Sequence, residues 1–384
     1  MRRLVVLLSA IVAVDIMFFT ALVPLLPHFT SRYDLSKAAA GVLMGMYAAG
    51  VLAASVPSGL AAARLGPRAA ALAGVSLTAV ASLAFAFAGD AWTLGAARLL
   101  QGVGSALSWA GALAWLVAAA PRGRRGQLIG TTMGAAVFGA LLGPVLGAVA
   151  TVAGVTATFV GVSVLGLGLA GWVLATPGVS AQPQSLSALG RADRRLLGGM
   201  WMLVLAALLF GVLDVLAPLQ LHAEGWGGVA IGGIFLTTAA VETVVNPVIG
   251  RFCDRRGVLL PIRVILLASA VLSLALAWAT AAPAVAVLVV ASAIAYGGLF
   301  TPGMALITDA AERRGIAAAI AFGAMNGAWA AGNVVGPVLG GWLADAAGDN
   351  LPYLLLAAVC AATLVATWTA APRYVQPRSR PSSP

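Results

Sequence analysis

Long uninterrupted runs of apolar residues are the feature that most restricts how this chain can fold. A helix that crosses the hydrocarbon layer of a membrane needs about 20 apolar residues. The sequence contains twelve such runs, near residues 4–27, 38–63, 69–88, 92–119, 127–150, 155–175, 199–221, 228–252, 258–280, 284–308, 316–342 and 351–371. Of the 384 residues 61% are hydrophobic and only 9% are charged, whereas a soluble surface needs far more charge. The sequence therefore predicts an all-α membrane protein with twelve transmembrane helices.

Basic residues are divided unequally between the two sides of these predicted helices. With the N-terminus in the cytoplasm, 19 of the 22 basic residues fall in cytoplasmic segments. Arg32 and Lys37 then lie outside, and Arg98 lies within a helix. This asymmetry is the positive-inside pattern, which predicts an inner-membrane protein with both termini in the cytoplasm. It also accounts for the net charge of +10, so we expect lipid rather than nucleic acid as the surrounding partner.

A polar segment midway along the chain divides it into two related halves. We expect a first six-helix bundle at 1–176, a cytoplasmic linker at 177–197, a second bundle at 198–372 and a cytoplasmic tail at 373–384. At a constant offset of 193, Gly134, Gly139, Gly143, Pro144 and Gly147 recur as Gly327, Gly332, Gly336, Pro337 and Gly340. Parallel six-helix repeats are typical of facilitator transporters, which bind substrate between the halves near the membrane midplane.

Three motifs fall in the first, fourth and fifth predicted helices. They are DIMFFTALVPLLP (15–27), RLLQGVGSA (98–106) and GALLGPVLGA (139–148), the last repeated as GNVVGPVLGG (332–341). Together they resemble motifs of the major facilitator superfamily, in particular its twelve-helix drug:proton antiporters. The resemblance implies the major facilitator fold, with two pseudo-symmetric six-helix bundles. It also implies that the motif containing Arg98 and Gln101 takes part in proton coupling.

A loop motif of the same family reads Gly, three residues, Asp, Arg, any residue, Gly. The first copy here keeps Gly59, Arg64 and Gly66 but has Ala63 at the Asp position. The second copy keeps Gly250, Asp254, Arg255 and Gly257. The resemblance implies an inner latch built with this Asp in the second half, whereas the first half lacks the residue for it.

Four charged residues lie well inside predicted helices: Asp15, Arg98, Asp214 and Glu242. An ionised side chain at the bilayer centre costs about 2.5–3.5 kcal/mol even on the insertion scale, so such residues must face a cavity or a partner. We expect proton and substrate to compete for Asp15, which antiport requires; the alternative is a fixed ion pair with Arg98. Asp214 and Glu242 are candidates for substrate charge recognition or a second proton. The alternative for Asp214 is a hydrogen bond to backbone freed near Pro218.

The remaining candidates are substrate contacts and packing residues. Three acids against one arginine favour a cationic substrate, and aromatic and sulfur side chains can hold a lipophilic cation. The expected substrate contacts are Phe18, Phe19, Tyr47, Gln101, Trp109, Phe138, Asn246, Tyr296, Met325, Asn326 and Trp329. Gly139, Gly143 and Gly147 recur every four residues and therefore fall on one helix face, where they permit close helix packing that Pro144 softens.

We therefore expect a proton-coupled exporter of a small, lipophilic or cationic organic compound that works by alternating access. A proton symporter for a small nutrient and a non-transporting receptor or scaffold are the alternatives. The chain lacks HExxH and GxSxG motifs and clustered Cys/His ligands, so we expect neither an enzyme nor a metal site or cofactor. The expected functional unit is a monomer.

Overall fold

The structure is a computed structural model that describes residues 1–121, 124–179, 194–314 and 318–369. Its helices are α1 (Arg2–Thr20), α2 (Leu22–Tyr33), α3 (Lys37–Arg64), α4 (Pro67–Ala86), α5 (Ala91–Ala119), α6 (Arg125–Ala153), α7 (Val155–Ala175), α8 (Arg194–Ala223), α9 (Gly228–Arg256), α10 (Leu259–Trp278), α11 (Ala282–Ala295), the short 3-10 helix η3 (Gly297–Leu299), α12 (Phe300–Arg314), α13 (Ala318–Ala347) and α14 (Asn350–Thr369). Eleven described segments are long and apolar enough to cross a membrane, and the 30-residue α13 occupies the remaining predicted position. The all-helical fold class is confirmed. Most of the predicted linker and the whole tail lie outside the described residues.

The first predicted transmembrane helix is interrupted after Thr20, where α1 ends and α2 begins. Pro24 explains the interruption, because it has no amide hydrogen to donate to the carbonyl of Thr20 and its ring crowds that carbonyl. The Thr20 hydroxyl instead donates to the carbonyl of Ile16 at 3.1 Å. The last carbonyl groups of α1 are thereby left available for partners outside the helix.

The tenth predicted helix is also interrupted, by η3 between α11 and α12. Gly297 and Gly298 weaken the helix at this point because glycine is a poor helix former. Pro302 cannot donate to the carbonyl of Gly298. Each half therefore contains one broken membrane helix.

The glycine motif packs in the same way in both halves. In the first half, a methyl group added at Gly143 of α6 would lie 2.9 Å from the carbonyl oxygen of Met17 in α1. In the second half, one added at Gly336 of α13 would lie 2.5 Å from the carbonyl oxygen of Leu208 in α8. In each half, glycine thus lets two backbones approach more closely than any other residue would permit.

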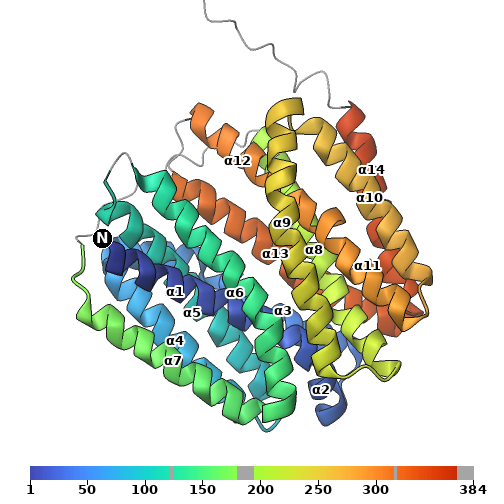
Figure 1. Cartoon of the computed structure of the whole chain (residues 1–384), viewed down its shortest axis with the longest axis horizontal. Coiled ribbons are helices and arrows are strands. Elements are labelled where there is room, and N and C mark those ends of the chain that lie inside the picture. The colour runs from blue at the N-terminus through green and yellow to red at the C-terminus, as the bar shows by residue number, and fades with distance from the viewer. Residues whose placement is uncertain (122–123, 180–193, 315–317, 370–384) are drawn as a thin grey trace, which may run out of the picture.

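The two halves meet mainly along two helix pairs, α3 with α13 and α6 with α9, and α2 also contacts α8 and α9. The Cα of Gly41 in α3 packs against the carbonyl of Pro337 in α13. A methyl group at Gly232 in α9 would lie 2.8 Å from the Cβ of Ala148 in α6. Figure 1 shows the bundles converging where α6 meets α9, with the start of α1 at the left and the end of α14 at the top. We call the end at which α1 starts the terminal end and the opposite end the distal end.

Close backbone contacts between the halves are found toward the distal end, at Gly41 and Gly232. Gly59, Gly134 and Gly327 lie on α3, α6 and α13 toward the terminal end. A methyl group added at any of them would meet no described atom within 4 Å. These three positions therefore make no close contact with the other half.

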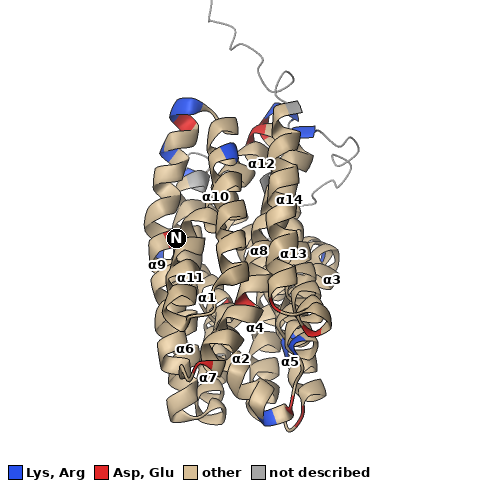
Figure 2. Cartoon of the chain, turned by 90° about the vertical axis from the view of Figure 1, so that its right-hand side faces the viewer, with Lys and Arg blue, Asp and Glu red and all other residues tan. Residues whose placement is uncertain are grey.

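Charged residues are concentrated at the ends of the bundle. Arg255 and Arg256 form the last turn of α9, and Arg313 and Arg314 form the last turn of α12. Figure 2 shows blue ribbon at the top of the view, above α10 and α12, and mostly tan ribbon on the helices below it, with a few red and blue segments around α5 and α8. A largely uncharged flank is what contact with lipid requires.

Candidate functional site

The carboxylate of Asp15 lies inside the first half, near the middle of the first broken helix. The side chain is 3% exposed. Its Oδ2 accepts hydrogen bonds from the Ser105 hydroxyl and from the Trp109 ring nitrogen, both at 2.7 Å. Its Oδ1 has no hydrogen-bond partner in the described structure. Asp15 is therefore a buried acid with hydrogen-bond partners on one carboxylate oxygen and none among the described groups on the other.

Arg98 stabilises the break in the first helix instead of pairing with Asp15. It is 1% exposed, and its guanidinium donates to the carbonyl oxygen of Phe18 at 3.1 Å and to that of Phe19 at 3.4 Å. A cation at the C-terminal end of a helix is favourable because the last carbonyls are unpaired and carry partial negative charge. Among the described residues no salt bridge joins Arg98 to Asp15. The alternative of a fixed ion pair between the two thus finds no direct contact here.

Arg98 is itself fixed by the helices around it. It donates to the Oε1 of Gln101 at 3.0 Å, and Gln101 in turn donates to the Ser82 hydroxyl at 3.0 Å. The guanidinium carbon lies 4.8 Å from the ring centre of Tyr47, within the range of a cation–π contact. These contacts join α1, α3, α4 and α5 around one buried positive charge.

Three aromatic side chains join the two halves next to this network. The ring centre of Phe19 lies 5.3 Å from that of Tyr47 and 4.9 Å from that of Trp329 in α13. Tyr47 is buried, whereas Phe19 and Trp329 remain partly exposed. The cluster places aromatic surface from both halves directly beside Arg98.

A second polar group surrounds the helix break in the other half. Glu242 of α9 packs directly on Gly297, where an added methyl group would lie 2.9 Å from the carboxylate carbon. Asn246 donates to the Oε1 of Glu242 at a long 3.4 Å and accepts from the Thr301 hydroxyl at 3.1 Å. Asp214 of α8 is close enough to Glu242 for their charges to interact. Neither acid forms a salt bridge with any described basic residue.

Aromatic rings line this second group on the α8 side. Phe210, one turn before Asp214, lies 5.9 Å from the ring of Tyr296 and 6.4 Å from that of Phe300. The Tyr296 hydroxyl is 2.8 Å from that of Ser273. The second half therefore combines two partly exposed acids with an aromatic wall.

Other predicted contacts lie elsewhere. Phe18 is buried and packs against Phe159 in the first half. Met325 packs in the core formed by α8, α12 and α13. Phe138 is 56% exposed and has no aromatic partner in the described chain. Asn326 is partly exposed and forms no side-chain hydrogen bond with the described residues.

The loop-motif residues lie at the terminal end. Gly66 and Gly257 adopt φ values of +95° and +75°, which explains why glycine ends both copies. Arg64 and Asp254 are exposed, and no described ion pair includes either of them. The latch expected from the family resemblance is therefore not formed in this conformation of the described residues.

Several residues of the site had no place in the sequence prediction. Ser105 is the clearest case, because Arg98, Gln101, Ser105 and Trp109 are spaced by three or four and so share one helix face. Ser82, Thr301 and Phe210 had no comparable signal. Among the described residues, no group of three or more His, Cys, Asp or Glu side chains could hold a metal ion.

Comparison with known families gives a match over almost the whole length. A model of the Major Facilitator Superfamily matches residues 8–326 and, in a second match, 284–384. The MFS-type transporter ppzB of Metarhizium rileyi is 33% identical over 140 residues, which are 35% of this chain and 29% of the relative. The probable vesicular acetylcholine transporter-B of Danio rerio is 33% identical over 142 residues, 35% of this chain and 27% of the relative. These matches thus span less than a third of the curated relatives.

Solved structures of low sequence identity share the fold. A bacterial homolog of the human lysosomal transporter Spinster, inward-facing and occupied, gives a TM-score of 0.81 at 15% identity and 98% coverage of both chains. A D-xylose-proton symporter gives 0.75 at 16% identity, with 95% of this chain and 97% of that chain covered. The arrangement of helices is therefore shared by proteins with different cargo.

Proposed function

Because the chain belongs to the Major Facilitator Superfamily, a family of transporters and not of enzymes, we propose that it is a proton-coupled antiporter that exports a small lipophilic organic cation. The observation that carries the proposal is the environment of Asp15. Its carboxylate is buried, has one oxygen without a partner among the described protein groups, and has no basic side chain in direct contact. A buried acid of this kind is costly to keep ionised, so it gains a proton readily when its surroundings change.

The proposed coupling uses the interface between the halves. Asp15 accepts hydrogen bonds from Ser105 and Trp109. Its neighbour Tyr47 belongs to the aromatic cluster that extends to α13. Substrate binding against this cluster would change the contacts of α1 and α5. Proton and cargo then compete, because both are favoured by the same negative charge. Competition for one charge is sufficient to exchange an inward proton for an outward cation.

Two acids of the second half supply further negative charge for recognition of the cation. Glu242 and Asp214 lie near one another, partly exposed, with no described basic partner. Two unpaired carboxylates repel each other and attract a cation. Phe210, which is partly exposed, supplies an aromatic face that favours a cation with apolar substituents, and the buried ring of Tyr296 packs against it. The relative named as a vesicular acetylcholine transporter agrees with a cationic cargo, although the match covers only part of each chain.

We place the protein in the inner membrane, with the terminal end in the cytoplasm. The arginine-rich turns of α9 and α12 lie at that end, as the positive-inside rule requires. In this orientation the close backbone contacts at Gly41 and Gly232 lie toward the outside, and the glycines without such a contact lie toward the cytoplasm. An exporter takes up its cargo from that side.

The test is transport by purified protein in proteoliposomes with an imposed pH gradient. We expect a lipophilic cation loaded on one side to move against its gradient when protons flow the opposite way. Panels of sugars, nucleosides and amino acids serve as comparisons, because a proton symporter shares the fold. Movement of cargo in the same direction as protons would replace antiport with symport. Absence of gradient-driven flux for every class would favour a receptor or scaffold.

A further inference from the structure

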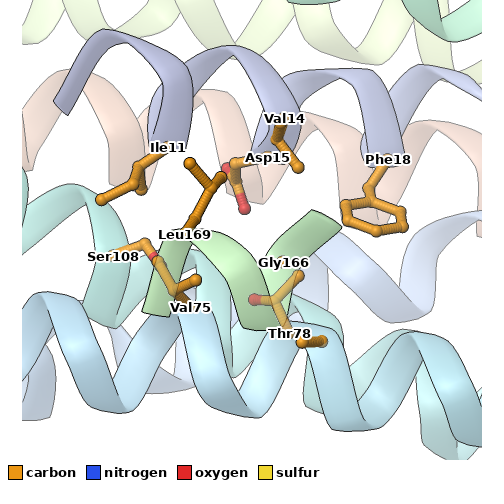
Figure 3. Close-up of a pocket in the computed structure, with 10 residues that line it drawn as sticks. Ile11, Val14, Asp15, Phe18, Val75, Thr78, Ser108, Gly166 and Leu169 are labelled. Carbon is orange, nitrogen blue, oxygen red and sulfur yellow. The ribbon is translucent and has the colours of Figure 1, made fainter. Parts of the chain in front are cut away.

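A small cavity lies inside the first half, on the side of Asp15 that faces α4 and α7. Its volume is about 20 Å³, and it is bounded by α1, α4, α5 and α7, with no residue from the second half. Figure 3 shows the Asp15 carboxylate pointing away from α1 into this space, with Thr78 and Ser108 on the facing helices. Gly166 of α7 allows α7 to pack closely on α4 at the edge of this space, since a methyl group there would lie 2.9 Å from the Cβ of Ala79.

Polar atoms without partners line the cavity. The Oδ1 of Asp15 and the Oγ1 of Thr78 are both buried, and neither has a hydrogen-bond partner in the described structure. Asp15 is 3% exposed, Thr78 is 6% exposed and Ser108 is 2% exposed. Ser108 likewise makes no side-chain hydrogen bond to a described residue. Leaving such a buried atom without a hydrogen-bond partner is unfavourable.

We propose that this cavity binds one water molecule, which donates to the Oδ1 of Asp15 and bonds the hydroxyl of Thr78. A water needs roughly 10–15 Å³ of such space and two to four polar partners, and the cavity satisfies both conditions. An organic ligand is excluded by size. A dry cavity is typical of purely apolar walls, and this wall has three polar side chains.

The water has a consequence for coupling, which rests on the proposed function of Asp15. Its partners all belong to the first half, so the site does not change when the halves move relative to each other. Asp15 then keeps one hydrogen-bonded oxygen toward the interior water in both conformations. The contacts of Oδ2 with Ser105 and Trp109 of α5 also lie within the first half. The hydrogen-bonded surroundings of Asp15, water included, therefore move with the first half as one unit, and the contact with the second half runs through Phe19 and Trp329.

The first test is direct observation in the full chain. A crystallographic or cryo-EM density map that resolves ordered water should contain one peak in this cavity, about 2.7–3.2 Å from both the Oδ1 of Asp15 and the hydroxyl oxygen of Thr78. A map of that quality without a peak there would overturn the proposal. This measurement needs no transport, so it is independent of whether antiport is correct.

The second test is the infrared C=O stretch of protonated Asp15, identified by its loss in Asp15→Asn. In Thr78→Val the water loses a partner, so the band should move to higher frequency. Thr78→Ser keeps the hydroxyl and should restore the original band, which excludes misfolding as the cause. Ser163→Ala is the matched control on α7, because the Ser163 hydroxyl donates only to the carbonyl of Phe159 at 2.8 Å. An unshifted band in Thr78→Val would count against the water site.

If proteoliposomes show no gradient-driven transport but the peak and the band shift are present, the antiport proposal fails and the water site stands. If transport is proton-driven but neither signal is seen, the water site fails and antiport stands.

Discussion

Asp345, near the end of α13, caps the helix that begins at Lys37 in the other half. Its two carboxylate oxygens accept hydrogen bonds from the backbone amides of Lys37 at 3.1 Å and of Ala38 at 2.8 Å. Ser36 satisfies the next amide, that of Ala39, at 3.2 Å. The Lys37 side chain pairs with Asp349, also in the second half, at 2.5 Å. The first turn of α3 is therefore completed by the opposite bundle.

We expect Asp345→Ala to open the distal end. Loss of a capping acceptor costs about 1 kcal/mol, which changes the ratio of closed to open molecules about fivefold. Spin labels at Ser31 and Ala346, both exposed, would report this as a larger population of long distances when Cys253 and Cys360 are replaced. Asp309→Asn is the matched control, because Asp309 pairs with Arg195 and Arg313 within the second half. An unchanged distance distribution in Asp345→Ala would show that the Asp345 cap does not keep the distal end closed.

The same contact predicts a dependence on external pH. Partial burial raises the pKa of Asp345, but the amides of Ala38 and Lys37, the Ser36 hydroxyl and the Lys37 charge outweigh it, so the pKa lies below its ordinary value of 3.8. The ionised form is the one that caps, so closure is complete above pH 3.8 and weakens as the pH falls through the lowered pKa. The labelled protein should therefore open in acid. Asp345→Asn should show no such transition at this site, and a transition of equal size in that variant would show that Asp345 is not the group responsible.

Asp15→Asn should abolish proton-driven transport while leaving the fold intact. We expect a loss of roughly tenfold or more in the gradient-driven rate, and each factor of ten corresponds to about 1.4 kcal/mol. Exchange of labelled for unlabelled cargo without a gradient should persist, because the amide can still accept from Ser105 and Trp109. Full gradient-driven transport by the variant would exclude Asp15 as the coupling residue.

Glu242→Gln should weaken the binding of cationic cargo more than the binding of neutral cargo. The Gln side chain has the size of Glu242 and can still pack against Gly297, but it carries no charge. We expect binding of a lipophilic cation to fall about tenfold, equivalent to about 1.4 kcal/mol, with a neutral analogue of similar shape changed little. Fluorescence titration of both compounds measures the difference. Equal losses for the two would indicate that Glu242 contributes shape and not charge.

Gly143→Ala should destabilise the first half. The added methyl group would overlap the Thr20 side chain and lie 2.9 Å from the carbonyl of Met17, and overpacking of this kind costs about 1–3 kcal/mol. Gly134→Ala on the same helix meets no described atom and should be neutral or stabilising by about 0.5–1 kcal/mol. Thermal unfolding in detergent should show a lowered Tm for Gly143→Ala and not for Gly134→Ala. Equal behaviour of the two would argue against close packing of α6 on α1.

The sequence was sufficient for the helices because their signals are local. Apolar length locates each span, whereas the break after Thr20 was not predicted and is explained by Pro24 only once the structure is known. The repeated glycines also indicate close packing, since a four-residue spacing fixes one face. Their partner helices, α1 and α8, depend on the tertiary fold and could not be read from that spacing.

The candidate site was only partly predictable, because its main contacts join distant segments. Asp15 and Arg98 were both expected at depth, yet Arg98 bonds backbone carbonyls that only a helix break exposes. Asp345 and Lys37 are 308 positions apart, and nothing local to either residue indicates the other. Charge and motif position predicted candidate residues such as Asp15 and Arg98, whereas their partners depend on three-dimensional packing.

Lys37 is the only lysine in the chain. Its amine lies at the contact between the halves, paired with Asp349 and about one third exposed. An amine-selective reagent therefore has a single lysine to modify, and the rate of its reaction should follow the opening and closing of the distal end. The protein carries its own site-specific reporter of conformation, which needs no introduced cysteine.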